Sequence, residues 1–262
     1  MIYICFGMTK SASTFLYQLT EETLRAAGRK PARLGPPFCP RWRVENYIDD
    51  IDPALLEAIA VATGGRDVVL KTHQGLHPEV ARRIDARSLL ASASIRDPRE
   101  IALAMVDHGR RSRRRGDAEF AECRTVFDAW PSLDNQIANL GRWSELKTLE
   151  VFRYNEICFD SATVVARIAT QIGVAIDAAT VLRPFRGSGR IGQFNKGAAL
   201  RYREMPPHEQ SAFLDRYARL YDSFWFDTST AEAVARTQDR QSPRARGELG
   251  HRLAGIRRLL NL

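Results

Sequence analysis

The sequence predicts an α/β fold with three layers (α/β/α), in which a mostly parallel central sheet lies between helices. Short apolar runs alternate along the chain with stretches whose apolar residues recur every three to four positions. That alternation is typical of a parallel sheet, because each crossover between parallel strands usually contains a helix. The chain has 262 residues and is 44% hydrophobic, so it is large enough to bury a core. No apolar run reaches the roughly 18 residues that a membrane-spanning helix needs.

The expected elements follow one another regularly. The first strand is expected at 2–7, directly before a loop. A helix follows from Ser13 to Gly28, because apolar residues keep helical spacing until that glycine. Several prolines mark 30–43 as an irregular loop. The other expected strands lie at 67–72, 89–95 and 148–154, and the other helices at 54–62, 99–109 and 162–172.

The composition favours anionic ligands and a reducing compartment. The formal net charge is +8, and phosphate, sulfate or an acidic surface would complement it. The four cysteines are widely spaced, which predicts reduced thiols rather than a disulfide framework or a metal site. The apolar residues 2–6 lack the basic region and the cleavage site of a signal peptide. We therefore expect a cytoplasmic protein whose mature chain begins at Met1.

Arginines concentrate in two segments, 110–115 and 236–262. We expect one domain over 1–235, with the first run following the helix that ends near Gly109, and a basic amphipathic tail over 236–262. Both runs fit a solvated surface, a contact for a polyanionic acceptor or an anionic membrane face. Apolar residues of the tail share one helical face, which would dock on the domain, on a second copy or on a membrane. They are Leu249, Leu253, Ile256, Leu259 and Leu260.

The segment after the first strand predicts an anion-binding loop. Gly7 to Leu16 reads Gly-Met-Thr-Lys-Ser-Ala-Ser-Thr-Phe-Leu, which places small and hydroxyl residues between a strand and a helix. Backbone N–H groups at a helix N-terminus point toward a bound anion, and Lys10 would add a point charge. A nucleoside-triphosphate P-loop would need a glycine directly before Lys10 and a longer loop. The alternative is an ordinary helix start capped by Ser11 or Ser13.

This segment resembles the 5′-phosphosulfate loop of sulfotransferases that use 3′-phosphoadenosine 5′-phosphosulfate (PAPS). Their pattern is roughly Pro-Lys-Ser-Gly-Thr-Thr-Trp/Phe-Leu; this chain has Thr9 in place of Pro and Ala12 in place of Gly. The resemblance implies a P-loop-like loop that holds the donor. The residues it assigns to the donor here are Lys10, Ser11, Ala12, Ser13, Thr14 and Phe15.

Two further segments resemble the family in the same order. Lys71-Thr72-His73 looks like the family's Lys-Thr-His, whose histidine is the general base. The segment starting at Arg96, which reads Arg-Asp-Pro-Arg-Glu, resembles the one whose arginine holds the 3′-phosphate. Family members usually carry a serine eight residues after that arginine. Ala104 stands there, and Ser94 is a candidate replacement.

Two weaker matches complete the resemblance, which spans about 2–226. Tyr154 corresponds to a tyrosine near the adenine, or else fills the core. The loop around Ser188, Gly189 and Arg190 resembles the family's late nucleotide-covering loop, where Arg186 or Arg190 would serve the 3′-phosphate. An amphipathic helix is expected after it, at 207–221. Segments 30–66 and 106–146 match nothing in the family and are expected to form the acceptor pocket.

The resemblance implies a PAPS-dependent sulfotransferase. It would move a sulfuryl group to a hydroxyl of a carbohydrate or small molecule by in-line displacement, leaving adenosine 3′,5′-bisphosphate. Lys10 would stabilise the leaving phosphate, and Lys71 would reach the transferring sulfuryl oxygens. His73, with an ordinary pKa near ~6.5, would accept the proton. No metal and no nucleic acid are expected as partners. The tail would contact a second copy of the chain or an anionic surface.

Two other classes of function remain open at this stage. A P-loop nucleotide-dependent kinase or phosphotransferase shares the strand–loop–helix, but it needs an aspartate at a strand end for Mg²⁺. The strand at 67–72 runs instead into Lys-Thr-His. A non-catalytic basic module for nucleic acid or membranes would explain the arginine runs. No aromatic residues interleave the run at 110–115, and no helix-turn-helix pattern appears.

Overall fold

The computed structural model describes residues 1–39, 45–186, 197–224, 226 and 228. The chain divides into two compact units. Unit 1 contains the described residues of 1–95 and 136–186, and unit 2 contains those of 96–135 and 197–228. The expected domain boundary at 235 and the tail at 236–262 lie outside the described residues.

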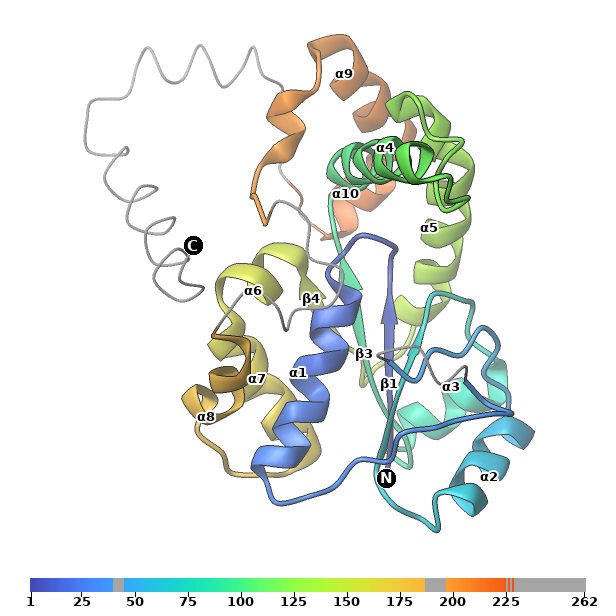
Figure 1. The fold of residues 1–262 in the computed structure, drawn as a ribbon, viewed down its shortest axis with the longest axis vertical. Coiled ribbons are helices and arrows are strands. Elements are labelled where there is room, and N and C mark those ends of the chain that lie inside the picture. Colours follow the sequence, from blue (N-terminus) through green and yellow to red (C-terminus); the bar gives the residue numbers. More distant parts are fainter. Residues whose placement is uncertain (40–44, 187–196, 225, 227, 229–262) are drawn as a thin grey trace. The chain divides into compact units, whose positions relative to one another are not determined.

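Unit 1 is built on a parallel sheet of four strands in the order β2-β1-β3-β4 (Figure 1). The strands are β1 (Ile2–Gly7), β2 (Val68–Thr72), β3 (Leu90–Ile95) and β4 (Glu150–Arg153). Phe6 of β1 pairs with Thr72 of β2, and Gly7 pairs with Ser94 of β3. Because these strands are parallel and in this register, their carboxyl ends meet at one edge of the sheet. Ligands of open α/β sheets bind at such an edge.

Helices cover both faces of this sheet, so the predicted three-layer α/β fold is confirmed. On one face, Tyr3 and Cys5 of β1 pack with Tyr17 and Leu24 of α1. On the other face, the ring of Phe6 stacks on Trp143 of α5 with 5.1 Å between centroids. The helices that contribute to unit 1 are α1 (Ser13–Ala26), α2 (Pro53–Ala62), α3 (Pro78–Asp85), α5 (Trp130–Ser144, from Gln136 on), α6 (Tyr154–Phe159), α7 (Ser161–Ile172) and α8 (Ala178–Leu182).

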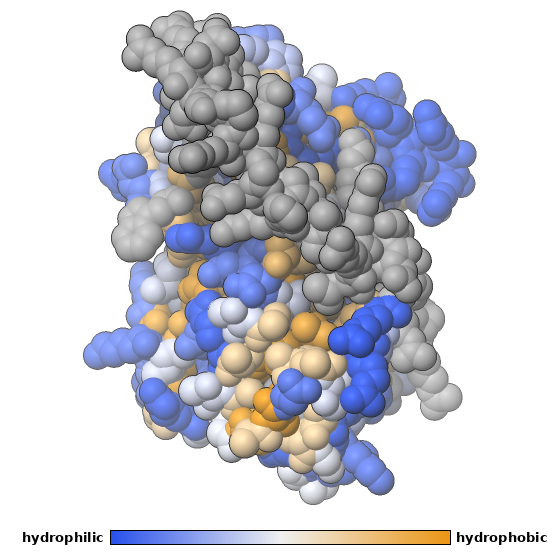
Figure 2. All heavy atoms as spheres, turned by 90° about the vertical axis from the view of Figure 1, so that its left-hand side faces the viewer, coloured by the Kyte–Doolittle hydropathy of each residue, from blue (hydrophilic) through white to orange (hydrophobic). Residues whose placement is uncertain are grey.

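A second apolar cluster joins α1 to α7 and α8. Phe15, Leu16 and Leu19 of α1 are buried there, at the three- and four-residue steps that the sequence shows. Partly buried apolar residues such as Ile172 and Ile176 surround the cluster. Apolar side chains gather at the surface on the lower half of the face shown in Figure 2. The start of α1 is therefore fixed by packing as well as by the strand before it.

Unit 2 is helical in the residues that the structure describes. It contains α4 (Pro98–Arg115), the first turns of α5, α9 (Pro207–Arg216), α10 (Ala218–Phe224) and the 3-10 helices Val126–Ala129 and Arg201–Glu204. Its centre is the fully buried Arg99, which pairs with Asp97 at 2.7 Å. The rings of Tyr202 and Tyr221 lie beside the Arg99 guanidinium, and Tyr221 donates a hydrogen bond to Asp97. These partners offset the cost of burying a charge.

Three predicted boundaries were wrong. The helix expected at 99–109 continues as α4 to Arg115, because arginine is a good helix former, and it ends at Gly116, where φ is 77°. The strand expected at 148–154 is shortened to β4, and Tyr154 begins α6. The helix expected at 207–221 is two helices that meet at Tyr217. Helices α3 and α5 were not expected at all.

Candidate active site

The candidate site lies in unit 1, where β1 and β2 end side by side. The loop 8–12 follows β1, and His73 follows β2. The His73 Nδ1 atom is 2.5 Å from the carbonyl oxygen of Gly7. The structure thus brings the predicted loop and the predicted base into direct contact.

The loop has a backbone that side chains rarely adopt. Lys10 and Ala12 both have positive φ, at 65° and 66°. Such a conformation costs a residue other than glycine roughly 1–2 kcal/mol. Ala12 therefore adopts the conformation that favours glycine, although the sequence has no glycine there. Backbone strain of this kind concentrates at functional sites.

The loop is anchored from beneath. The Ser11 hydroxyl is 2.6 Å from that of Ser94, and it also donates to the Met8 carbonyl. A Cβ on Gly7 would lie 2.4 Å from Ser13 Cβ and 2.4 Å from Ser94 Oγ, so no other residue fits at position 7. Ser94 is fully buried and holds the loop, which argues against its predicted role as a 3′-phosphate donor.

Helix α1 begins without a side-chain cap. Its N-cap is Ala12, which offers no acceptor, so the alternative of a helix capped by Ser11 or Ser13 is wrong. The first N–H groups of a helix lack partners within the helix and carry partial positive charge. An anion above Ser13 and Thr14 would accept from them. The side chain of Phe15 packs into the apolar cluster, so only the backbone of Phe15 is available to an anion at the start of α1.

Lys71 lies beneath the start of α1. Its side chain is 3% exposed, and Nζ donates to Thr14 Oγ1 at 2.7 Å and to Glu45 Oε1 at 3.0 Å. The pair satisfies a buried charge that would otherwise be costly. Lys71 is thereby held against one of the hydroxyls assigned to the donor.

Sequence reasoning missed Glu45 and Tyr47. The residues 46–48 run along β2: Asn46 accepts from the Lys71 amide, and Ile48 donates to the Lys71 carbonyl. This pairing brings the Glu45 carboxylate to Lys71 and the Tyr47 ring to 5.4 Å from the His73 ring. The sequence did contain one signal for Glu45. A lysine inside an apolar strand is buried, and a buried ammonium group requires a nearby carboxylate.

The imidazole of His73 is held in its neutral form in this environment. Burial lowers its pKa from the ordinary value to about 4, and the positive charges of Lys71 and Lys10 act in the same direction. The expectation of an unperturbed pKa was therefore wrong. A carbonyl only accepts hydrogen bonds, so Nδ1 carries the proton and Nε2 carries the lone pair.

Arg96 belongs to unit 2. Its side chain is 5% exposed, and Nε donates to Glu100 at 3.0 Å. Glu100 also accepts from the backbone N–H of Arg201. Ala104 lies buried in α4, where its methyl group offers no hydrogen bond. The assignment of Arg96 to a 3′-phosphate stays a prediction.

The remaining predicted residues are dispersed. Tyr154 is buried at the start of α6, in edge contact with Phe159, and Arg186 is exposed after a short 3-10 helix. Ser188, Gly189 and Arg190 lie outside the described residues. Within the described part of the chain, no cluster of metal-binding side chains and no helix long and apolar enough to cross a membrane occurs.

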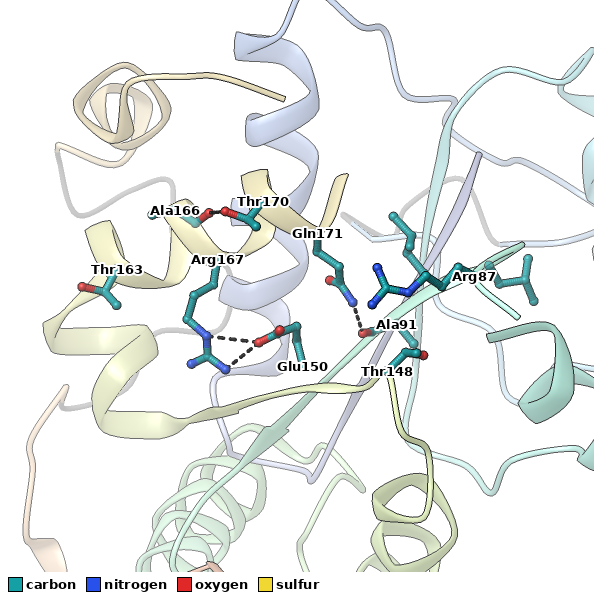
Figure 3. A pocket seen from close by; sticks show the side chains of 11 residues that line it. Arg87, Ala91, Thr148, Glu150, Thr163, Ala166, Arg167, Thr170 and Gln171 are labelled. Carbon is teal, nitrogen blue, oxygen red and sulfur yellow. Dashed lines mark hydrogen bonds and ion pairs between the residues drawn. The ribbon is translucent and has the colours of Figure 1, made fainter. Parts of the chain in front are cut away.

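A cavity of about 420 Å³ lies in unit 1 at the opposite ends of the strands. It is lined by residues near the starts of β3 and β4 and by α7. Arg167 pairs there with Glu150 at 2.6 Å, and Gln171 donates to the Ala91 carbonyl (Figure 3). This cavity contains none of the residues predicted for catalysis.

Comparison with solved structures identifies the architecture. Retinol dehydratase in complex with androsterone and the inactive cofactor PAP matches with a TM-score of 0.51 and 13% identity, over 83% of this chain and 79% of that chain. Its complex with retinol and PAP gives 0.52 and 13%, over 83% and 80%. Mouse sulfotransferase SULT7A1 complexed with PAP gives 0.52 and 13%, over 82% of each chain. The chain has the sulfotransferase fold.

The sulfotransferase fold is shown by structure alone. No family model matches the sequence, and no curated protein matches it either. At 13% identity the likeness shows a common fold. The sulfotransferase fold agrees with the resemblance that the motifs at Lys10, His73 and Arg96 indicate.

Proposed function

We propose that this protein transfers a sulfuryl group from PAPS to a hydroxyl group of a carbohydrate or small-molecule acceptor. One observation carries the proposal. The neutral His73 contacts the end of β1, directly before a strained loop that contains Lys10 and leads into an uncapped helix. A base beside an anion cradle is what transfer of an anionic group to a hydroxyl requires.

The loop and the start of α1 bind the phosphosulfate in this proposal. The N–H groups of Ser13 and Thr14 face the 5′-phosphate, because nothing in the N-cap side chain competes for them. Lys10 stabilises the charge that develops on the bridging oxygen as the S–O bond to the phosphate breaks. Ser11 contributes by shaping the loop, since its hydroxyl and its backbone N–H are both bonded within the protein.

His73 accepts the proton of the acceptor hydroxyl at Nε2. As the new O–S bond forms, that proton moves to the imidazole, and adenosine 3′,5′-bisphosphate (PAP) leaves with the electron pair of the broken S–O bond. The Gly7 carbonyl stabilises the resulting imidazolium through Nδ1. The donor's negative charge opposes the effect of Lys10 and Lys71 on the His73 pKa and thereby favours protonation of the imidazole during transfer.

The other assignments are part of the same proposal. Arg96 recognises the 3′-phosphate, Tyr154 lies near the adenine, and Arg186 or Arg190 serves the 3′-phosphate. These roles rest on the resemblance of the surrounding segments. The proposal also includes that the protein acts in the cytoplasm, uses PAPS as co-substrate and requires no metal.

Ligand-induced stabilisation tests the donor class. PAP should raise the melting temperature, whereas Mg-ATP should not, because β2 ends in Lys71-Thr72, is followed by His73 and supplies no carboxylate for Mg²⁺. Labelled PAPS with a panel of hydroxyl acceptors then tests transfer. Stabilisation by Mg-ATP alone would support the phosphotransferase alternative and reject the proposal.

A further inference from the structure

Helix α4 of unit 2 presents a row of guanidinium groups to solvent. Arg110, Arg114 and Arg115 are exposed, and Arg111 is half-buried. At 3.6 residues per turn these four positions fall within an arc of about 140°. The row therefore occupies one face of the helix.

The opposite face of α4 is packed. A Cβ on Gly109 would lie 2.1 Å from the Phe120 carbonyl, and Arg113 donates to the carbonyls of Ala121 and Cys123. Arg113 thus holds the loop after α4. We call Arg110, Arg111, Arg114 and Arg115 the α4 arginine face.

The α4 arginine face is electrostatically unfavourable by itself. Arg110 and Arg114 are four residues apart, as are Arg111 and Arg115, and like charges at that spacing destabilise a helix by about 0.2–0.5 kcal/mol per pair. Asp107 is the one acidic residue between 101 and 115. Its carboxylate is bonded to Arg201 at 2.9 Å and is 4.0 Å from Arg110. The helix dipole offsets part of the repulsion.

The chemistry of the face selects among anionic partners. A membrane-binding helix needs apolar side chains beside its basic ones, and none occurs among residues 110–115. Single-stranded nucleic acid is bound with stacking aromatics, and the nearby Phe120 packs on His108 at 5.0 Å instead. Guanidinium forks pair directly with carboxylate and sulfate groups.

We propose that the α4 arginine face binds a polysaccharide that carries carboxylate or sulfate groups. This proposal does not rest on the proposed sulfuryl transfer, because it concerns α4 alone.

Binding is measured on the full-length protein without donor. Heparin and polygalacturonate serve as the sulfated and the carboxylated probe, over a salt series. The variant is Arg114→Gln with Arg115→Gln, and the control is Arg82→Gln with Arg219→Gln, two exposed arginines elsewhere. Both double variants lower the net charge by two, so general attraction is matched.

The expected result is a loss in the α4 variant alone. The slope of log K against log salt should become shallower by about 2, and affinity should fall by roughly tenfold at physiological salt. An equal loss in the control would overturn the proposal, because net charge would then explain binding. Tighter binding to duplex DNA or to phosphatidylserine vesicles, with the same dependence on Arg114 and Arg115, would also overturn it.

Discussion

The ammonium nitrogen of Lys71 lies 3.0 Å from a carboxylate oxygen of Glu45, and both side chains are almost excluded from solvent. The pair lies next to the hydroxyl of Thr14, at the start of the uncapped helix. Glu45 stabilises the protein without ligand, because it compensates a buried charge. The same negative charge opposes an anionic donor. Stability and donor affinity are therefore expected to respond to Glu45 in opposite directions.

Glu45→Gln should destabilise the free protein by about 3 kcal/mol, since a buried charge then lacks its partner. It should also tighten PAP binding, because the bound anion replaces the lost carboxylate. Urea unfolding and calorimetry measure the two effects. Glu57→Gln, which removes the carboxylate of an exposed pair with Arg83, is the control and should change neither. Weaker PAP binding by the Glu45 variant would contradict this interpretation.

His73→Asn should lower turnover by ~10²-fold or more, the usual scale for a general base. An asparagine amide is able to donate to the Gly7 carbonyl as Nδ1 does, so the loop should keep its contact. PAP affinity should therefore stay close to that of the wild type. Turnover with a true acceptor that equals the wild-type rate would show that another group accepts the proton.

The lowered pKa of His73 predicts how stability depends on pH. In the unfolded chain this histidine binds a proton near pH ~6.5, whereas in the folded protein it does so only near pH 4. Between these values the unfolded state binds more protons, so the free energy of unfolding should fall as pH falls. Urea unfolding at pH 7.5 and pH 5 should show a smaller loss in His73→Asn than in the wild type. Equal losses would exclude this linkage.

Ala12→Gly should stabilise the protein by up to about 1 kcal/mol. The substitution relieves the strain of a φ of 66°. Glycine also gives the unfolded chain more backbone entropy, which opposes folding, but the relief of strain is the larger effect. Ala27→Gly is the matched control, because Ala27 caps the other end of α1 at a φ of −81° and should lose stability. Both are measured by urea unfolding. The opposite order would mean that the left-handed geometry of the loop is not the source of strain.

Arg96→Ala should weaken PAP binding by about 1.5–3 kcal/mol, the range for a hydrogen bond to a charged group. Binding of adenosine 5′-phosphosulfate, which lacks the 3′-phosphate, should change far less. Because Glu100 loses its ion pair in this variant, Arg96→Lys is measured beside it: the charge remains, but the planar fork is lost. Calorimetry with PAP and with adenosine 5′-phosphosulfate measures the two affinities. Equal losses of affinity for both ligands would reject the assignment of Arg96 to the 3′-phosphate.

Local patterns were sufficient to predict the sheet and to place the segments around Lys10 and His73 at its edge. Gly7, Lys10 and His73 lie next to the strand ends that position them, so a few adjacent residues carry both the structure and the chemistry. Parallel pairing of β1 with β2 then brings the two segments together. The predicted α/β fold needed no information beyond apolar periodicity.

The rest depends on contacts between distant residues. Glu45 meets Lys71 across 26 positions, and it lies just after the segment 30–43, whose prolines predicted a loop. The φ of Ala12 follows from the anchoring of Ser11 to Ser94, and no propensity of alanine predicts it. The pKa of His73 is set mainly by its burial, which only the packed structure shows. The helix boundary at Arg115 was missed because the arginine run was interpreted as surface charge rather than as helix-forming sequence.

The hydroxyl pair of Ser11 and Ser94 has a consequence for how fast a donor arrives. It ties the loop to β3, while the Met8 amide is bonded to the Ser94 carbonyl and the Thr9 amide to Gln136. A loop held at Met8, Thr9 and Ser11 is already shaped before a ligand enters. The association rate should then be set by diffusion and by attraction to a protein of charge +8. Association should accordingly follow a single exponential whose rate rises linearly with ligand concentration and falls with added salt.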